Sequence, residues 1–298
     1  MKSAHGMKTA FWSVVKYTLA IALLVLVIRH AGVDKIFGYL KKIPPFQLVL
    51  GFALISCAQI ASAMRMRFFF RSAGFHLNAR FAIILFYVGA FYNFLLPGGI
   101  GGDAYKVVLT RRRMNLTAKQ GIHIMLADRA SGLCVIMFTM YAGLMALDFH
   151  DTIPYAKPLI IAAALVTFTG YLFFSRLLLK QRPGVMIGSL PYSVCTQGLW
   201  VAGVLIICGA LSGSAYAVEY IVLYCTASIT GMVPASPGGL GIKEYTYYKG
   251  AELLQHYAHS GVNPDLGIAI SLCIFFLMLT ASMPALLWVS KVEKAEFS

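Results

Sequence analysis

Two glycine-rich segments carry the residues whose types and spacing are best suited to binding chemistry. They share the pattern Pro-Gly-Gly-aliphatic-Gly, followed within a few residues by an acid and a lysine. The members are Pro97, Gly98, Gly99, Gly101, Gly102, Asp103 and Lys106 in the first segment and, 140 residues later, Pro237, Gly238, Gly239, Gly241, Lys243 and Glu244 in the second. Glycine lets a backbone approach a ligand closely, and a helix that begins after such a run presents free N–H groups that suit a phosphate. We expect both segments to bind an anionic headgroup.

A structural alternative exists for each segment taken alone. The glycines would then only form loops, and Asp103, in the position expected for an N-cap, and Glu244 would cap helices and pair with nearby lysines. Because the acid and the lysine recur at matching positions, we favour the binding interpretation. Asp128 and Arg129 form a further charged pair inside an apolar run. Such charges are costly in hydrocarbon and face a cavity or a partner, so a binding role and a helix-linking role both stay open.

The elements that position these residues are predicted to be membrane helices. Hydrophobic residues make up 59% of the 298 residues and charged residues 12%, and the mean hydropathy is +0.75. Apolar runs of about 18 or more residues recur along the chain, which is the length that a bilayer-spanning helix requires. They lack the alternation of a transmembrane barrel. The sequence therefore predicts an all-α polytopic membrane protein.

The remaining composition argues against several other classes. The net charge of +14 comes from basic residues in short loops between apolar runs, which is typical of anchoring at acidic headgroups and not of nucleic-acid binding. The six cysteines have no metal-ligand or paired spacing. No catalytic motif is present, so we expect no enzymatic activity and no cofactor.

About six full spans and two re-entrant helical hairpins are expected. The spans are predicted at 9–28, 46–64, 119–147, 158–175, 185–211 and 266–289. The first hairpin returns through Ala104–Thr110, which covers roughly 10 Å against a hydrocarbon core of about 30 Å. The second returns through Ile242–Tyr257, which carries four charged residues. Neither return arm is therefore suited to cross the whole membrane. Within the span 46–64, Gln59 and Ser62 are interpreted as helix-packing groups.

Charge counting orients the chain with both termini in the cytoplasm. In that orientation sixteen of the 25 lysines and arginines fall in cytoplasmic segments. The two hairpins then enter from opposite faces, in half-repeats of roughly 46–147 and 185–290. Opposed breaks of this kind indicate an inverted repeat with a binding site near the middle of the membrane.

At these residues the sequence resembles the flippase-like integral membrane family, which includes the membrane domain of the lysylphosphatidylglycerol synthases (multiple peptide resistance factors). The resemblance is carried by Leu96–Asp103, Ala127–Arg129 and Val233–Glu244. It implies lipid translocation, with aminoacylated phosphatidylglycerol, polyprenyl-phosphate-linked lipids or hopanoids as candidate substrates. The soluble transferase domain of the synthases is absent from this sequence, so lipid lysinylation is not expected. Lys106 stands where the family often has arginine, which keeps the charge without bidentate recognition.

We therefore expect a flippase or scramblase in a bacterial or archaeal cytoplasmic membrane that moves an anionic or phosphate-bearing lipid. Lys106, Arg129 and Lys243 would hold the headgroup, with Asp103, Asp128 and Glu244 as their counter-charges. The expected partners are membrane lipids with anionic headgroups and, as an open option, further copies of the chain. The alternatives are a secondary transporter of a small solute and an accessory subunit of a membrane lipid or glycan transferase.

Overall fold

The structure is a computed structural model, and it describes residues 33–95, 101–148, 153–177, 182–212, 215–233 and 237–288. The described residues form helices and connecting turns and include no strand, which confirms the all-α prediction. The elements in chain order are α2 (Val33–Leu40), α3 (Pro45–Ser72), α4 (Ala79–Leu95), α5 (Gly101–Met114), α6 (Ala118–Ala146), α7 (Ala156–Leu177), α8 (Pro183–Ser212), α9 (Ala217–Thr230), the 3-10 turn η1 (Pro237–Gly239), α10 (Ile242–Tyr257), α11 (Pro264–Ser282) and the 3-10 helix η2 (Met283–Leu287).

Five of these helices are long and apolar enough to cross a membrane. They are α3, α6, α7, α8, and α11 together with η2. The remaining predicted span, 9–28, lies outside the described residues. Helices α4 and α9 are apolar but shorter, as their expected place in hairpins requires.

The structure departs from the predicted elements at three places. Helix α3 continues to Ser72, so Arg65 lies inside the helix and not at its end. Helix α5 has 14 residues and is twice as long as the predicted arm, yet at 1.5 Å per residue it covers only about 21 Å. The segment between the predicted spans 9–28 and 46–64 contains the short helix α2. Helix α10 matches the predicted return arm Ile242–Tyr257.

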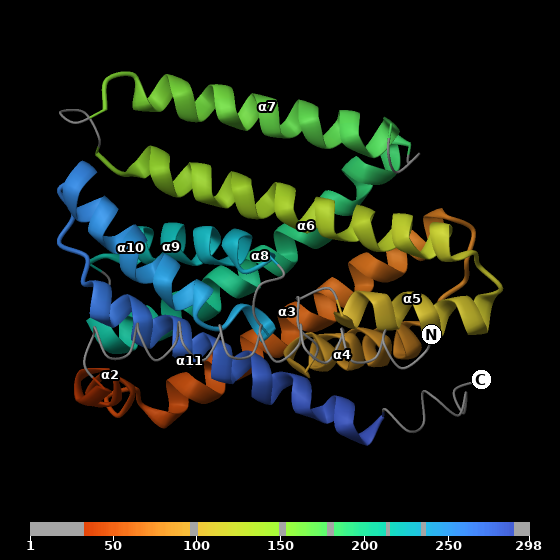
Figure 1. Cartoon of the computed structure of the whole chain (residues 1–298), viewed down its shortest axis with the longest axis horizontal. Coiled ribbons are helices and arrows are strands. Elements are labelled where there is room, and N and C mark those ends of the chain that lie inside the picture. Colours follow the sequence, from red (N-terminus) through yellow and green to blue (C-terminus); the bar gives the residue numbers. More distant parts are fainter. Residues whose placement is uncertain are drawn as a thin grey trace, which may run out of the picture.

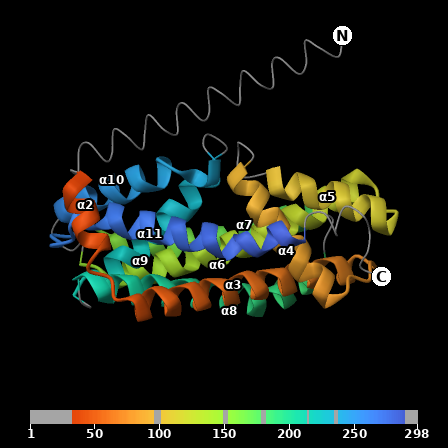
Figure 2. The same cartoon turned by 90° about the horizontal axis from the view of Figure 1, so that it is seen from below.

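The long helices lie side by side and are flanked by two helical hairpins. Figure 1 shows α4 and α5 in the right half of the molecule and α9 and α10 in the left half. Figure 2 shows the same division from below. The open ends of the hairpins are fixed by separate contacts, because Arg113 of α5 lies over the Phe81 ring of α4, and Ser260, after α10, bonds Glu219 of α9.

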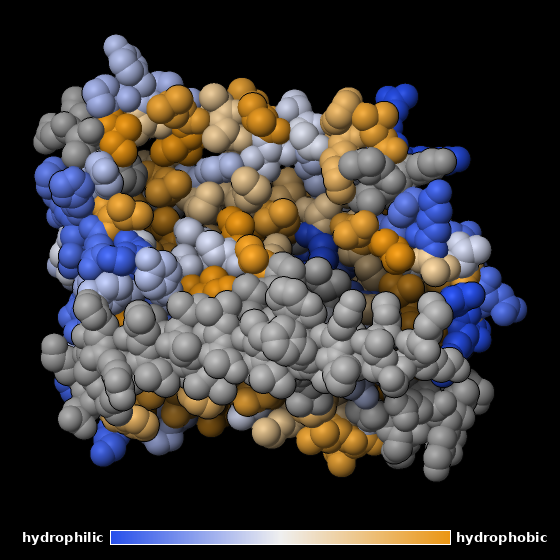
Figure 3. Space-filling model, viewed as in Figure 1, coloured by the Kyte–Doolittle hydropathy of each residue, from blue (hydrophilic) through white to orange (hydrophobic). Residues whose placement is uncertain are grey.

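Each hairpin has its own hydrophobic core. One core gathers the ends of α3 and α6 around α4, with Phe69, Phe70 and Leu85 fully buried. The other gathers α8, α9, α10 and α11, with Tyr220 and Tyr247 at its centre. Helices α3 and α8 run antiparallel between them, since Gly51 lies against Ile207 and Gly188 against Phe68. Figure 3 shows hydrophilic residues at the left and right ends and hydrophobic ones between, as expected for a bundle that crosses a bilayer along its long axis.

Candidate functional site

The last turn of α4, just before the first glycine break, meets the second break, which lies far along the sequence. Phe94, in the last turn of α4, packs against Gly238 of the second break, where an added Cβ would lie 2.9 Å from the ring. Gly238 has φ +60° and Gly239 φ +79°, a backbone region that favours glycine. The Phe94 ring also meets Phe275 of α11 edge to face, with centroids 5.4 Å apart. The Phe94 ring therefore connects α4 with the second break and with α11.

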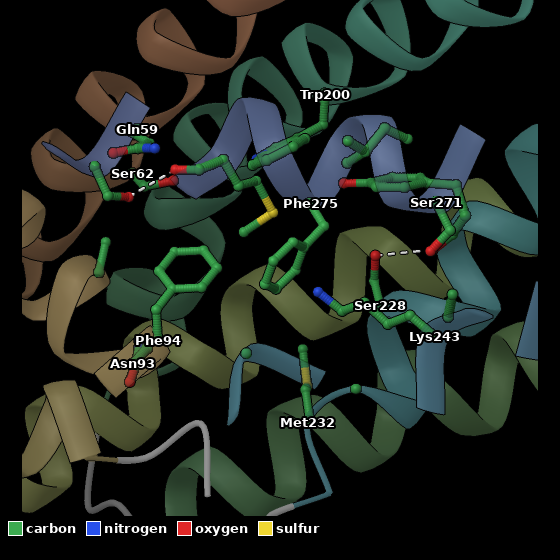
Figure 4. A pocket seen from close by; sticks show the side chains of 18 of the residues that line it. Gln59, Ser62, Asn93, Phe94, Trp200, Ser228, Met232, Lys243, Ser271 and Phe275 are labelled. Carbon is green, nitrogen blue, oxygen red and sulfur yellow. Dashed lines mark hydrogen bonds between the residues drawn. The ribbon is translucent and has the colours of Figure 1, made fainter. Parts of the chain in front are cut away.

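A cavity of about 290 Å³ lies where the end of α4 meets the second glycine break. It is enclosed by α3, α4, α6, α8, α9, α10 and α11, and Figure 4 shows side chains converging on it from several of them. Its described lining contains two cations, Arg129 and Lys243, and no carboxylate. The polar part of the wall is completed by Gln59, Ser62, Asn93, Tyr224, Ser228, Tyr247, Ser271 and Ser282. The cavity is thus suited to an anion.

The Lys243 side chain enters the cavity between Gly231 and Gly239. An added Cβ would lie 2.6 Å from the Lys243 side chain at Gly231 and 2.8 Å from it at Gly239, so only glycine leaves room at both positions. Figure 4 shows the side chain reaching into the cavity toward Phe94 and Phe275. Among the described residues, Lys243 makes no hydrogen bond and no ion pair. Its charge is available to a ligand.

Glu244 turns away from the cavity and fixes the start of α10. One carboxylate oxygen accepts the backbone N–H of Gly241 at 2.6 Å and the other accepts the hydroxyl of Ser271 at 2.7 Å. The residue has no exposed surface. Glu244 therefore anchors α10 to α11, and neither of its hydrogen bonds goes to a lysine.

Asp103 joins two cations from neighbouring helices. Its Oδ1 lies 3.1 Å from the ammonium of Lys106, and its Oδ2 accepts a hydrogen bond from Nε of Arg129. Asp103 lies in the first turn of α5 but is not the N-cap, because the helix begins at Gly101. The backbone N–H of Gly102 instead donates a hydrogen bond to Oδ1 of Asn93 at 2.9 Å. The cluster links α5 to α6.

Only Arg129 of this cluster lines the cavity. Lys106 packs against Gly89, where a Cβ would lie 2.2 Å from its Cε, and its ammonium lies 4.4 Å from the centre of the Phe86 ring. Phe86 belongs to the cavity wall, so Lys106 lies behind that ring. The Arg129 side chain is 31% exposed, whereas that of Lys106 is 5% exposed.

Asp128 does not share a partner with its sequence neighbour Arg129. It pairs with Arg65 of α3 at 2.7 Å, and both side chains are only 9% exposed. Arg65 also donates to Ser193 of α8 at 3.1 Å. Ser131 lies 2.7 Å from both Ser193 and Ser189, so the network connects α3, α6 and α8. Asp128 therefore serves the helix-linking role that the sequence left open.

The remaining predicted residues mark the breaks themselves. Pro97, Gly98 and Gly99 lie outside the described residues, and Pro237 begins η1. Gly102 packs backbone to backbone against α4, because a Cβ there would lie 1.8 Å from the carbonyl oxygen of Gly89.

Several residues of the site were not predicted from the sequence. Gln59 and Ser62 were interpreted as packing groups, yet both line the cavity, and Asn93 and Trp200 do so as well. Arg65 was also missed, because the span predicted at 46–64 ends just before it. The apolar Phe68–Phe70 run that follows it in the sequence was the available signal that the helix continues.

A bundle of long apolar helices around a cation-lined central cavity defines a multi-pass helical membrane protein with an internal cavity. The family model of the lysylphosphatidylglycerol synthase TM region matches residues 13–180, and the chain belongs to this family. The match includes Asp103, Asp128 and Arg129 and ends before α8. No curated protein matches the sequence.

Proposed function

We propose that this protein moves an anionic, phosphate-bearing lipid between the leaflets of a bacterial or archaeal cytoplasmic membrane without altering it chemically. The observation that carries the proposal is the central cavity, whose described lining holds Arg129 and Lys243 but no carboxylate. A cationic wall inside an apolar bundle is costly unless an anion or another partner compensates it. Family membership supports a membrane protein of the synthase or flippase type.

The size of the cavity fits a headgroup and not a whole lipid. Its volume of about 290 Å³ lies at the lower end of small-molecule pockets, which range over roughly 300–1,000 Å³. The wall also contains the rings of Phe86, Phe94 and Phe275. In this proposal the headgroup enters the cavity and the acyl chains stay in the surrounding bilayer.

The order of the elements supports an inverted repeat. Long, short, short and long helices follow one another in α3 to α6, with 28, 17, 14 and 29 residues. The same order recurs in α8 to α11, with 30, 14, 16 and 19 residues. We propose that the two hairpins enter from opposite faces, with both termini in the cytoplasm, and open the cavity to each leaflet in turn.

Translocation in proteoliposomes tests this function. A tail-labelled fluorescent phosphatidylglycerol is incorporated, and its movement is followed by chemical quenching of the outer leaflet. Lys243→Met should slow this movement at least about tenfold, since it removes a charge-assisted hydrogen bond. Lys249→Met is the matched control, because Lys249 is on the same helix but exposed and paired with Glu252 at 2.7 Å.

The alternatives give different outcomes in the same vesicles. If the native chain moves no labelled phospholipid and no polyprenyl phosphate but takes up a soluble anion, it is a solute transporter. If Lys249→Met slows lipid movement as much as Lys243→Met, the cavity is not the translocation site.

A further inference from the structure

The charges around the cavity do not cancel. Among the described residues, Arg129 and Lys243 line it, Lys106 lies behind the Phe86 ring, and two carboxylates lie beside these three cations, Asp103 and Glu244. Both oxygens of Glu244 accept hydrogen bonds, from the Gly241 N–H and the Ser271 hydroxyl. Arg65 and Asp128 neutralise each other. In the described part of the chain, the side chains around the cavity therefore carry one net positive charge, and Lys243 is the cation that forms no salt bridge there.

The helix dipoles add little to this balance. Each hairpin brings a helix C-terminus and a helix N-terminus to the same tip: α4 ends and α5 begins at the first break, and α9 ends and α10 begins at the second. The partial charges at these ends are about −0.5 and +0.5, so they largely compensate within each hairpin. The side chains decide the charge that the site accepts.

From this balance we propose that the cavity selects a headgroup with a single negative charge, that is, a phosphodiester, over a dianionic phosphate and over a zwitterion. This selectivity rests on the proposed translocation function. A phosphodiester pairs with Lys243 and leaves the site neutral. A dianion leaves one negative charge uncompensated in an apolar bundle, which is costly. A zwitterion adds a cation beside Lys243 and Arg129.

Asp103 sets the preference at the other side of the cavity. Asp103 forms a salt bridge with Arg129, so one of the two cations of the cavity wall already pairs with a carboxylate of the protein. Removing that carboxylate should turn a site for one negative charge into a site for two. Removing Lys243 should turn it into a site for none.

Three tail-labelled lipids test the proposal at about pH 8. Phosphatidylglycerol carries one negative charge, phosphatidylethanolamine is zwitterionic, and phosphatidic acid is mostly dianionic because phosphomonoesters lose their second proton near pH ~6. The native chain should move phosphatidylglycerol fastest. Asp103→Asn should raise the rate for phosphatidic acid relative to phosphatidylglycerol about tenfold, which is the effect of one charge at roughly 8–10 Å.

Lys243→Met is the second variant, and it should raise the rate for phosphatidylethanolamine relative to phosphatidylglycerol by a similar factor. It makes the test independent of Asp103→Asn, which removes the carboxylate that Lys106 and Arg129 share and so changes the contact between α5 and α6. Size-exclusion profiles in detergent identify folded variants, and Lys249→Met should leave every ratio unchanged.

The outcomes separate this proposal from the function on which it rests. If phosphatidylglycerol moves but no folded variant changes the ratios, charge selection is overturned while translocation stands. If the native chain moves phosphatidic acid as fast as phosphatidylglycerol, charge selection is also overturned. If none of the three lipids moves, the proposed function itself fails.

Discussion

At the scale of single residues, neighbouring charges in the sequence act in different places. Asp128 and Arg129 are adjacent, but successive residues of an α-helix point about 100° apart. Asp128 therefore meets Arg65 of α3, whereas Arg129 faces Asp103 and the cavity. The Asp128–Arg65 pair is buried and connects α6 with α3. The Asp103–Arg129 pair leaves the Arg129 cation on the cavity wall.

The buried Arg65–Asp128 pair gives a prediction about stability. Asp128→Asn should destabilise the protein by about 3–5 kcal/mol, because it leaves the Arg65 charge buried without its partner. The double variant Arg65→Met with Asp128→Leu should recover most of this loss, since it removes both charges. Thermal unfolding in detergent, followed by circular dichroism, measures both effects. A double variant less stable than Asp128→Asn would contradict this account.

At the scale of elements, both hairpins use the same contact between a lysine and a glycine. Lys106 of α5 packs on Gly89 of α4, and Lys243 of α10 packs on Gly231 at the end of α9. In each hairpin the missing side chain lets a long cation lie flat against the preceding helix. The glycines outside the breaks are therefore part of the site as well.

Gly89→Ala tests this contact. The three atoms nearest to the new methyl group would all belong to the Lys106 side chain. We therefore expect Lys106 to move away from Asp103 and stability to fall by about 1–3 kcal/mol. Gly209→Ala in α8 is the matched control, because no atom lies within 4 Å of its added Cβ. It should leave stability unchanged or raise it by up to about 1 kcal/mol.

Adding Lys106→Ala to Gly89→Ala should relieve the overlap. The loss in the double variant should then be smaller than the sum of the two single losses. Strict additivity of the unfolding free energies would show that the two side chains do not interact.

At the scale of the whole molecule, the two ends of the bundle differ in charge. The end that holds the α3–α4, α5–α6 and α7–α8 connections carries Arg71, Arg80, Arg111, Arg112, Arg113, Lys119, Arg176 and Arg182. The described part of these connections and their flanking turns includes no carboxylate. The other end carries Asp148, Glu219, Glu252 and Asp265 beside its lysines. The asymmetry predicts that the basic end is cytoplasmic.

Cysteine labelling tests this orientation. In a variant without the six native cysteines, Arg112→Cys after the first hairpin should react with a membrane-impermeant maleimide only from the cytoplasmic side. His259→Cys after the second should react only from outside. Labelling of both positions from one side would rule out the opposed hairpins.

The sequence by itself determined the class of the protein and the limits of most helices. Length and hydropathy suffice for this, because each membrane helix must satisfy its own backbone hydrogen bonds and show an apolar surface. The run predicted at 119–147 is helix α6 at 118–146, and the glycine breaks lie between the helices that they were expected to separate. Membership of the family was also correctly inferred from the motifs.

Only the tertiary structure decided which charges meet and which polar residues face the cavity. Gln59 of α3 and Asp128 of α6 are both polar residues within apolar runs of the sequence, yet one lines the cavity and the other binds Arg65. The partner of a side chain depends on how its helix is rotated and packed, and neither is encoded in local composition. The meeting of Phe94 with Gly238 is of the same kind, because packing between distant segments brings the end of α4 against the second break.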